Sequence, residues 1–127
     1  MANKRLDASL GTVGFDNLFI ENIPEADVVA VKLAASQGVL ARGTLISGTP
    51  GGSDFAALAI AADGAKALYV LADDVDTGTD GAVVGVAYRT GHFNRAAVAV
   101  KEEYTLTAAD EEVLRGKGIL LSDALDY

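Results

Sequence analysis

Short apolar segments separated by glycine-containing turns make up most of this sequence from Val28 onward, and this pattern constrains the fold most strongly. Val, Leu, Ile and Ala fill the segments, whereas Gly, Pro, Asp and Ser stand between them. Such punctuation is typical of strands joined by turns. The expected strands cover residues 28–33, 39–46, 55–62, 68–72, 82–88, 96–100 and 119–121.

Two polar segments between these strands predict surface loops. Residues 47–54 contain Pro50, which fixes one backbone dihedral, followed by two glycines that permit positive φ. Residues 73–81 are rich in aspartate.

Further along, Gly91 is expected to interrupt the chain after the strand at 82–88, with Phe93 filling the core beyond it.

One helix is expected, beginning near Thr107. The Thr107 hydroxyl can accept the free amide of Asp110, and the Asp110 carboxylate can return the bond, which is the arrangement of a capping box. Val113 and Leu114 supply an apolar face, and Gly116 or Gly118 can end the helix. The sequence therefore predicts a mostly β fold with one short C-terminal helix, an α+β class.

Composition excludes several functions. The chain has 127 residues, no cysteine, and 10 basic against 18 acidic side chains, for a net charge of −8. One domain of this size needs no disulfide or metal to fold. Because phosphate binding relies on Lys and Arg, we expect no direct nucleic-acid partner. We also expect no cofactor, no secretory signal and no membrane span.

Two chemical alternatives remain open on sequence alone. The loop at 73–81, with Asp73, Asp74, Asp76 and Asp80, suggests a calcium- or carbohydrate-binding module, although the spacing does not fit an EF-hand. A small hydrolase using Ser53 or His92 is the weaker alternative, since no nucleophile elbow surrounds the serine. Because the spacing does not fit an EF-hand and the nucleophile elbow is missing, we expect neither a metal site nor an enzyme.

Residues 1–27 differ from the rest and are interpreted as an N-terminal arm, with residues 28–127 forming a single β-rich domain. The arm has a basic pair, Lys4 and Arg5, and an apolar cluster of Phe15, Leu18, Phe19 and Ile20. The apolar cluster could form a strand of the body or could pack on a partner. The sequence alone leaves both possibilities open.

The order of several short motifs carries a resemblance. Leu-Ala-Arg-Gly-Thr-Leu at 40–45 is followed by Leu-Ala-Asp-Asp-Val-Asp at 71–76, Arg-Thr-Gly-His-Phe-Asn at 89–94 and Leu-Arg-Gly-Lys-Gly-Ile at 114–119. In this order they resemble the lambda-like phage head decoration proteins. The resemblance covers about residues 36–121, and its structural landmarks are Arg42, Gly43, Thr44, Gly91 and Phe93.

The resemblance implies a small β-barrel-like or β-tulip-like decoration domain with an extended N-terminal arm. It implies a virion protein, made in the host cytoplasm, that binds the major capsid protein on the outside of the expanded head. There, such proteins commonly form trimers at local three-fold positions and stabilise the shell against the pressure of packaged DNA. The arm residues expected to contact the capsid are Lys4, Arg5, Phe15, Leu18, Phe19 and Ile20.

Overall fold

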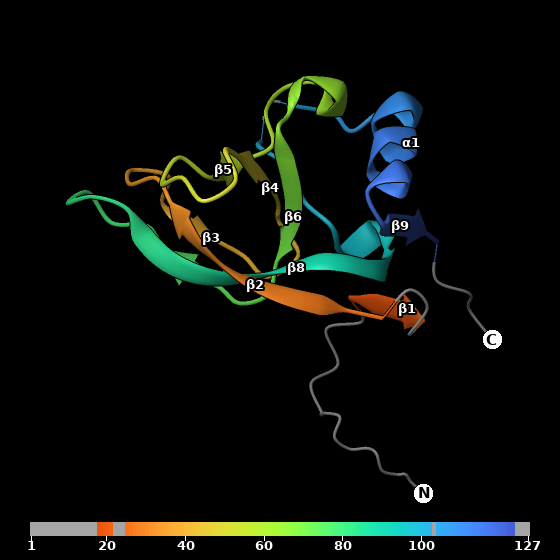
Figure 1. Cartoon of the computed structure of the whole chain (residues 1–127), viewed down its shortest axis with the longest axis horizontal. Coiled ribbons are helices and arrows are strands. Elements are labelled where there is room, and N and C mark those ends of the chain that lie inside the picture. The colour runs from red at the N-terminus through yellow and green to blue at the C-terminus, as the bar shows by residue number, and fades with distance from the viewer. Residues whose placement is uncertain (1–17, 22–24, 103, 124–127) are drawn as a thin grey trace, which may run out of the picture.

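The computed structural model describes residues 18–21, 25–102 and 104–123, and in these residues strands dominate and one α-helix lies near the C-terminal end (Figure 1). The strands are β1 (Phe19–Glu21), β2 (Asp27–Leu33), β3 (Val39–Leu40), β4 (Leu45–Gly48), β5 (Ala56–Ala57), β6 (Ala67–Leu71), β7 (Val75–Asp76), β8 (Val83–Asn94) and β9 (Ile119–Ser122). The helices are α1 (Ala108–Gly116) and the 3₁₀ turns η1 (Ala62–Gly64) and η2 (Arg95–Ala97). The predicted mostly β, α+β class with one short C-terminal helix is confirmed.

Strand β8 organises the main sheet. Along one side of it, β1 and β2 follow each other and pair antiparallel with it (Figure 1). Along the other side, β6 pairs antiparallel at Ala87 and Tyr88, and β9 pairs parallel from Gly91 to Asn94. The sheet continues from β6 to β4 and β5, while β3 and β7 form a separate two-stranded sheet.

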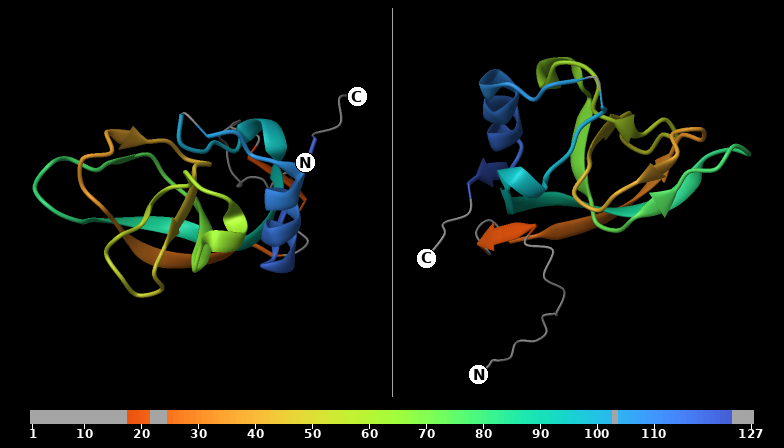
Figure 2. Two further views of the ribbon diagram at one scale, coloured as in Figure 1. Left: turned by 90° about the horizontal axis from the view of Figure 1, so that it is seen from above. Right: turned by 180° about the vertical axis from the view of Figure 1, so that it is seen from behind.

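The far end of the sheet curls back toward β2. An isolated parallel bridge joins Leu33 of β2 to Phe55, the residue before β5. Two hydrogen bonds support it, from Ala34 N–H to the Phe55 carbonyl (2.9 Å) and from Phe55 N–H to the Lys32 carbonyl (3.3 Å). The strands thus approach a barrel-like arrangement, visible from above in Figure 2, but the sheet stays open along the rest of β2.

Two apolar cores lie on opposite faces of the sheet because successive residues of a strand point to opposite sides. In β6, Leu68 and Val70 pack into the first core, whereas Ala67 and Leu71 pack into the second. The first core also holds Leu18, Leu45, Leu58, Ala62, Phe93, Leu114 and Ile119. The second also holds Val31, Leu33, Leu40, Ile46, Phe55 and Ala87. A strand covered on both faces explains the continuous apolar run from Ala67 to Leu71.

Helix α1 begins as its sequence predicts. The Thr107 hydroxyl accepts the Asp110 N–H (3.2 Å), and the Asp110 carboxylate accepts the Thr107 N–H (3.0 Å). The same carboxylate accepts the Ala62 N–H (2.8 Å) and the Tyr104 hydroxyl. Asp110 therefore caps the helix and also holds η1 against it. After the helix, Gly118 adopts a positive φ of 90° and leads into β9.

Several predicted strands need correction. The expected strand at 39–46 is two strands, β3 and β4, because the chain turns at Gly43, where φ is +95°. The expected strand at 55–62 is regular only in β5 and then enters η1. The expected strand at 96–100 was wrong: η2 occupies its start, since the Asn94 side chain accepts the Ala96 N–H (3.1 Å).

Two further boundaries differ from prediction. The expected interruption at Gly91 does not occur, because β8 continues through it to Asn94 with Gly91 at a φ of +155°. The predicted loop at 73–81 contains the short strand β7, which pairs with β3. By contrast, the strands expected at 28–33, 68–72 and 119–121 agree with β2, β6 and β9 to within one residue at each end.

Candidate site at the base of the N-terminal segment

Most of the sequence landmarks meet at one place in the fold, where β1 joins the sheet. Leu18 and Phe19 come from the start of the described chain, Arg42 and Gly43 from the turn before β4, and three residues from β8. We call this group the arm anchor. It consists of Leu18, Phe19, Arg42, Gly43, Tyr88, Gly91 and Phe93.

Three aromatic rings form the centre of the arm anchor. The Phe19 ring centroid lies 4.9 Å from that of Tyr88, edge to face, and 4.8 Å from that of Phe93. Phe93 is fully buried, as its predicted core role requires. Aromatic pairs in such geometries contribute beyond the area they bury. Packing on these two rings therefore holds β1 to the sheet, in addition to a ladder of only a few residues.

Arg42 covers this aromatic group from the adjoining turn. Its guanidinium carbon lies 5.5 Å from the Tyr88 ring centroid and 6.0 Å from that of Phe19, within reach of a cation–π interaction. Its Nη1 donates hydrogen bonds to the Ala72 carbonyl (2.7 Å) and the Tyr88 hydroxyl (2.9 Å). Arg42 thus ties the turn before β4 to β8 and to the end of β6.

Two glycines in the arm anchor allow close approach of the backbone. At Gly43, with φ of +95°, a Cβ atom would overlap the Ala97 carbonyl oxygen and lie 3.3 Å from Leu18 Cδ1. At Gly91 a Cβ atom would lie 2.7 Å from the Phe93 ring and 3.1 Å from the Phe19 ring. Both positions require a glycine, because a side chain at either one would collide with these neighbouring atoms.

The predicted capsid-binding residues fall into two groups. Lys4, Arg5 and Phe15 lie outside the described residues. Leu18 is 1% exposed in the first core, and its carbonyl accepts the Asn94 N–H (2.6 Å). Phe19 packs against the same core, and Ile20 is half-buried in β1. The described part of the apolar cluster therefore forms a strand of the body, which was one of the two possibilities that the sequence left open.

Tyr88 is the residue of the arm anchor that sequence reasoning missed. Strict alternation along β8 puts Tyr88 and Phe93 on opposite faces of the sheet. Between β2 and β8, however, Asp27 pairs with Thr90 and Val28 pairs with Tyr88, so Arg89 is an extra residue. This bulge reverses the alternation and brings the Tyr88 and Phe93 rings to a centroid distance of 5.9 Å. No turn residue in the sequence marks the bulge.

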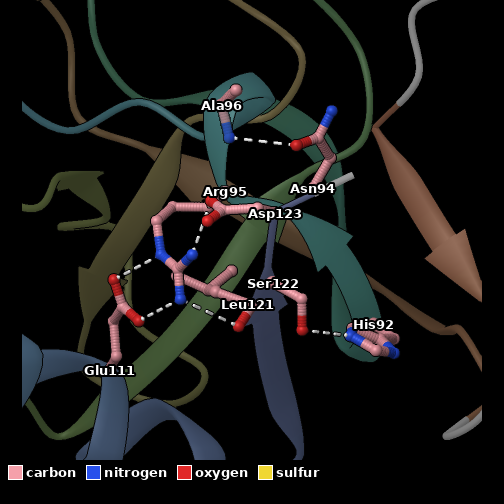
Figure 3. Close-up of polar contacts among 8 residues, drawn as sticks. All are labelled: His92, Asn94, Arg95, Ala96, Glu111, Leu121, Ser122 and Asp123. Atoms are coloured by element: carbon pink, nitrogen blue, oxygen red, sulfur yellow. Dashed lines mark hydrogen bonds and ion pairs between the residues drawn. The ribbon is translucent and has the colours of Figure 1, made fainter. Parts of the chain in front are cut away.

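A polar cluster secures the C-terminal strand beside the arm anchor (Figure 3). The Arg95 guanidinium donates to both carboxylate oxygens of Glu111 (2.8 Å each), to Asp123 (2.6 Å) and to the Leu121 carbonyl (3.3 Å). Its hydrogen bonds to Glu111, then those to Asp123, raise the pKa of Arg95. Arg95 therefore links α1 and β9 to the end of β8.

Three residues of the two chemical alternatives, His92, Asp74 and Asp76, have polar partners in the structure. His92 Nε2 lies 2.7 Å from the Ser122 hydroxyl (Figure 3). Ser53 lies in the exposed loop before Phe55. In the acidic loop, Asp74 accepts the Arg42 N–H (2.8 Å) and Asp76 accepts the Gly78 N–H (3.0 Å). Among the described residues, no three His, Cys, Asp or Glu side chains are placed to hold a metal ion together.

Comparison with known families decides the relationship. The profile of the family described as bacteriophage lambda head decoration protein D matches residues 12–119. The chain belongs to this family. The match includes every residue of the arm anchor and the apolar cluster of the predicted arm, while Lys4 and Arg5 lie outside it. Membership in the head decoration family gives the chain a role in decorating a phage head, and the predicted resemblance is confirmed.

No curated protein sequence matches the chain. Among the residues that the structure describes, no helix is both long and apolar enough to cross a membrane.

Proposed function

We propose that this head decoration protein binds the outer surface of the expanded phage head through the major capsid protein and stabilises the shell against internal DNA pressure. It acts as a homotrimer at local three-fold positions, without catalysis and without a cofactor, after synthesis in the host cytoplasm. The observation that carries the proposal is the family match over residues 12–119.

The arm anchor supports a division of labour within residues 1–27. Leu18 and Phe19 are packed into the body, so this part of the predicted arm serves as its attachment. Lys4, Arg5 and Phe15 precede the attachment point and are the residues we assign to capsid contact. A fixed attachment point lowers the entropy lost when the preceding segment binds, and thus favours binding.

The net charge of −8 supports contact through selected surfaces. Acidic copies repel one another and an acidic shell unless the contacting residues are neutral or basic. The adjacent pair Lys4 and Arg5 meets this requirement. Weak contacts of single copies suffice when three copies are joined, because linkage raises the effective concentration of each.

Co-sedimentation with undecorated heads tests the proposal. The full chain should bind expanded heads saturably and should not bind unexpanded proheads, and a chain lacking residues 1–17 should bind expanded heads more weakly. This truncation keeps Leu18 and Phe19, which pack in the first core, so we expect its thermal unfolding to match that of the full chain. Weaker binding by a chain of unchanged stability would reflect the loss of capsid contacts. Binding of neither form of the head by the folded full chain would contradict the proposal. Undiminished binding by the truncated chain would remove the role assigned to Lys4, Arg5 and Phe15.

A further inference from the structure

Among the described residues, part of the outer edge of β2 has no backbone hydrogen-bond partner. In the described part of the chain, β2 has one strand partner, β8, and a bridge to Phe55 at its C-terminal end. The Lys32 carbonyl points away from β8, toward Phe55. Because backbone groups alternate in direction along a strand, those of Val28 and Ala30 point the same way, and no described strand lies beside them. An edge of this kind is a template for another strand.

A hollow of about 120 Å³ adjoins this edge. It lies between β2 and the loop before Phe55 and is lined by Val29, Val31, Lys32, Gly52, Phe55 and Tyr69, among others. The loop that forms its outer wall has a defined shape, since the Thr49 N–H (2.9 Å) and hydroxyl (3.0 Å) both donate to the Asp54 carboxylate. These two bonds lower the pKa of Asp54. The combination of a free edge and a side-chain hollow is the arrangement used to bind an extended peptide.

Charge and sterics indicate the occupant. Of the two charged side chains on β2, Asp27 is paired with Arg89, whereas Lys32 has no ion pair among the described residues, so β2 itself suits a neutral or acidic segment. The basic start of a second copy, with Lys4 and Arg5, does not match it. Strand β2 of a second copy also fits poorly, because Phe55 already occupies the edge at Leu33 and leaves room only beside residues 28–31.

We propose that the edge of β2 accepts a short extended segment of the major capsid protein as an added strand. Backbone hydrogen bonds form at Val28 and Ala30, and one small apolar side chain of the segment fills the hollow beside Val29. This inference rests on the proposed decoration function and adds a second contact to that of the N-terminal residues. It makes the described body itself, as well as the arm, a capsid-binding element.

A pair of matched substitutions tests the contact. Val29→Phe fills the hollow. Val28→Phe makes the same change one residue away, on the opposite face of β2, where the Val28 side chain is 55% exposed. In co-sedimentation with expanded heads, Val29→Phe should weaken binding by about tenfold or more, and Val28→Phe by no more than about twofold. Circular dichroism melts of both variants establish that they are folded. Equal binding by the two variants would overturn the proposal.

Hydrogen exchange gives a test that needs no substitution. The amides of Val28 and Ala30 should exchange rapidly in the free protein and become protected on expanded heads. Unchanged exchange on saturated heads would overturn the proposal, as would protection in the free protein that grows with its concentration, since the occupant would then be a second copy. If the unmodified chain fails to bind heads at all, the decoration function itself fails, and that result is distinct from these.

Discussion

Replacement of Asp110 by Asn should produce a loss of stability that depends on pH. Asp110 is 2% exposed, and its carboxylate accepts hydrogen bonds from Ala62, Tyr104 and Thr107. Burial alone raises the pKa of this carboxyl, but the hydrogen bonds outweigh burial and lower the pKa from 3.8 to about 2. An asparagine keeps an acceptor at this position and lacks the charge.

The size of the effect follows from the pKa. A carboxyl whose pKa falls from 3.8 to about 2 on folding stabilises the folded protein by about 2 kcal/mol at neutral pH. Because the folded-state pKa is the lower one, this stabilisation is complete above pH 5, falls to roughly half by pH 3, and is lost below pH 2. The Asp110→Asn variant should therefore be about 2 kcal/mol less stable at pH 7, and the difference should shrink as the solution is acidified.

Urea unfolding at pH 7, 5, 4 and 3 measures this difference. The chain contains no tryptophan, so far-ultraviolet circular dichroism is the suitable signal. Glu112→Gln is the matched control, because Glu112 is an exposed carboxylate on the same helix that pairs only at the surface with Arg115. The control should change stability by less than about 0.5 kcal/mol. A loss at Asp110 that is the same at pH 7 and pH 3 would refute the reasoning.

Three other substitutions test the arm anchor and the C-terminal strand. Phe19→Ala should cost about 2 kcal/mol in urea unfolding, because it removes ring contacts with two neighbours; a cost below about 0.5 kcal/mol would contradict the role of the arm anchor. Gly43→Ala should cost more than Gly51→Ala in the same assay, because both have positive φ but only Gly43 faces a backbone carbonyl; equal costs would argue against the close approach. Arg95→Gln should speed protease cleavage within the segment that follows α1 and contains β9, whereas Arg115→Gln should not. Unchanged cleavage would show that β9 does not depend on Arg95.

The sequence predicted elements whose cause is local. The capping box depends on Thr107 and Asp110 three residues apart, and the structure forms both of its hydrogen bonds. Strand β6 is a continuous apolar run because both of its faces are covered. In both cases the residues that determine the element lie within it, so pattern and propensity suffice.

Elements determined by distant partners were not predictable in this way. At Gly91, within β8, the Phe93 and Phe19 rings occupy the place that a Cβ atom would take. Phe19 belongs to β1, which is far from Gly91 in the sequence. The bulge at Arg89 depends on the register between β2 and β8. Without it, Tyr88 could not be assigned to the arm anchor. The sequence thus named most residues of the site, and only tertiary pairing shows that they meet.

The position of the bound protein on the head is the property that the proposed function defines most sharply. Electron cryo-microscopy of expanded heads incubated with the full chain would show where the chain is bound. We expect trimeric density on the outer surface at local three-fold positions, into which the described domain fits with the start of β1 directed toward the shell. Absence of added density at saturating protein, or density only on the inner surface, would contradict the proposed function.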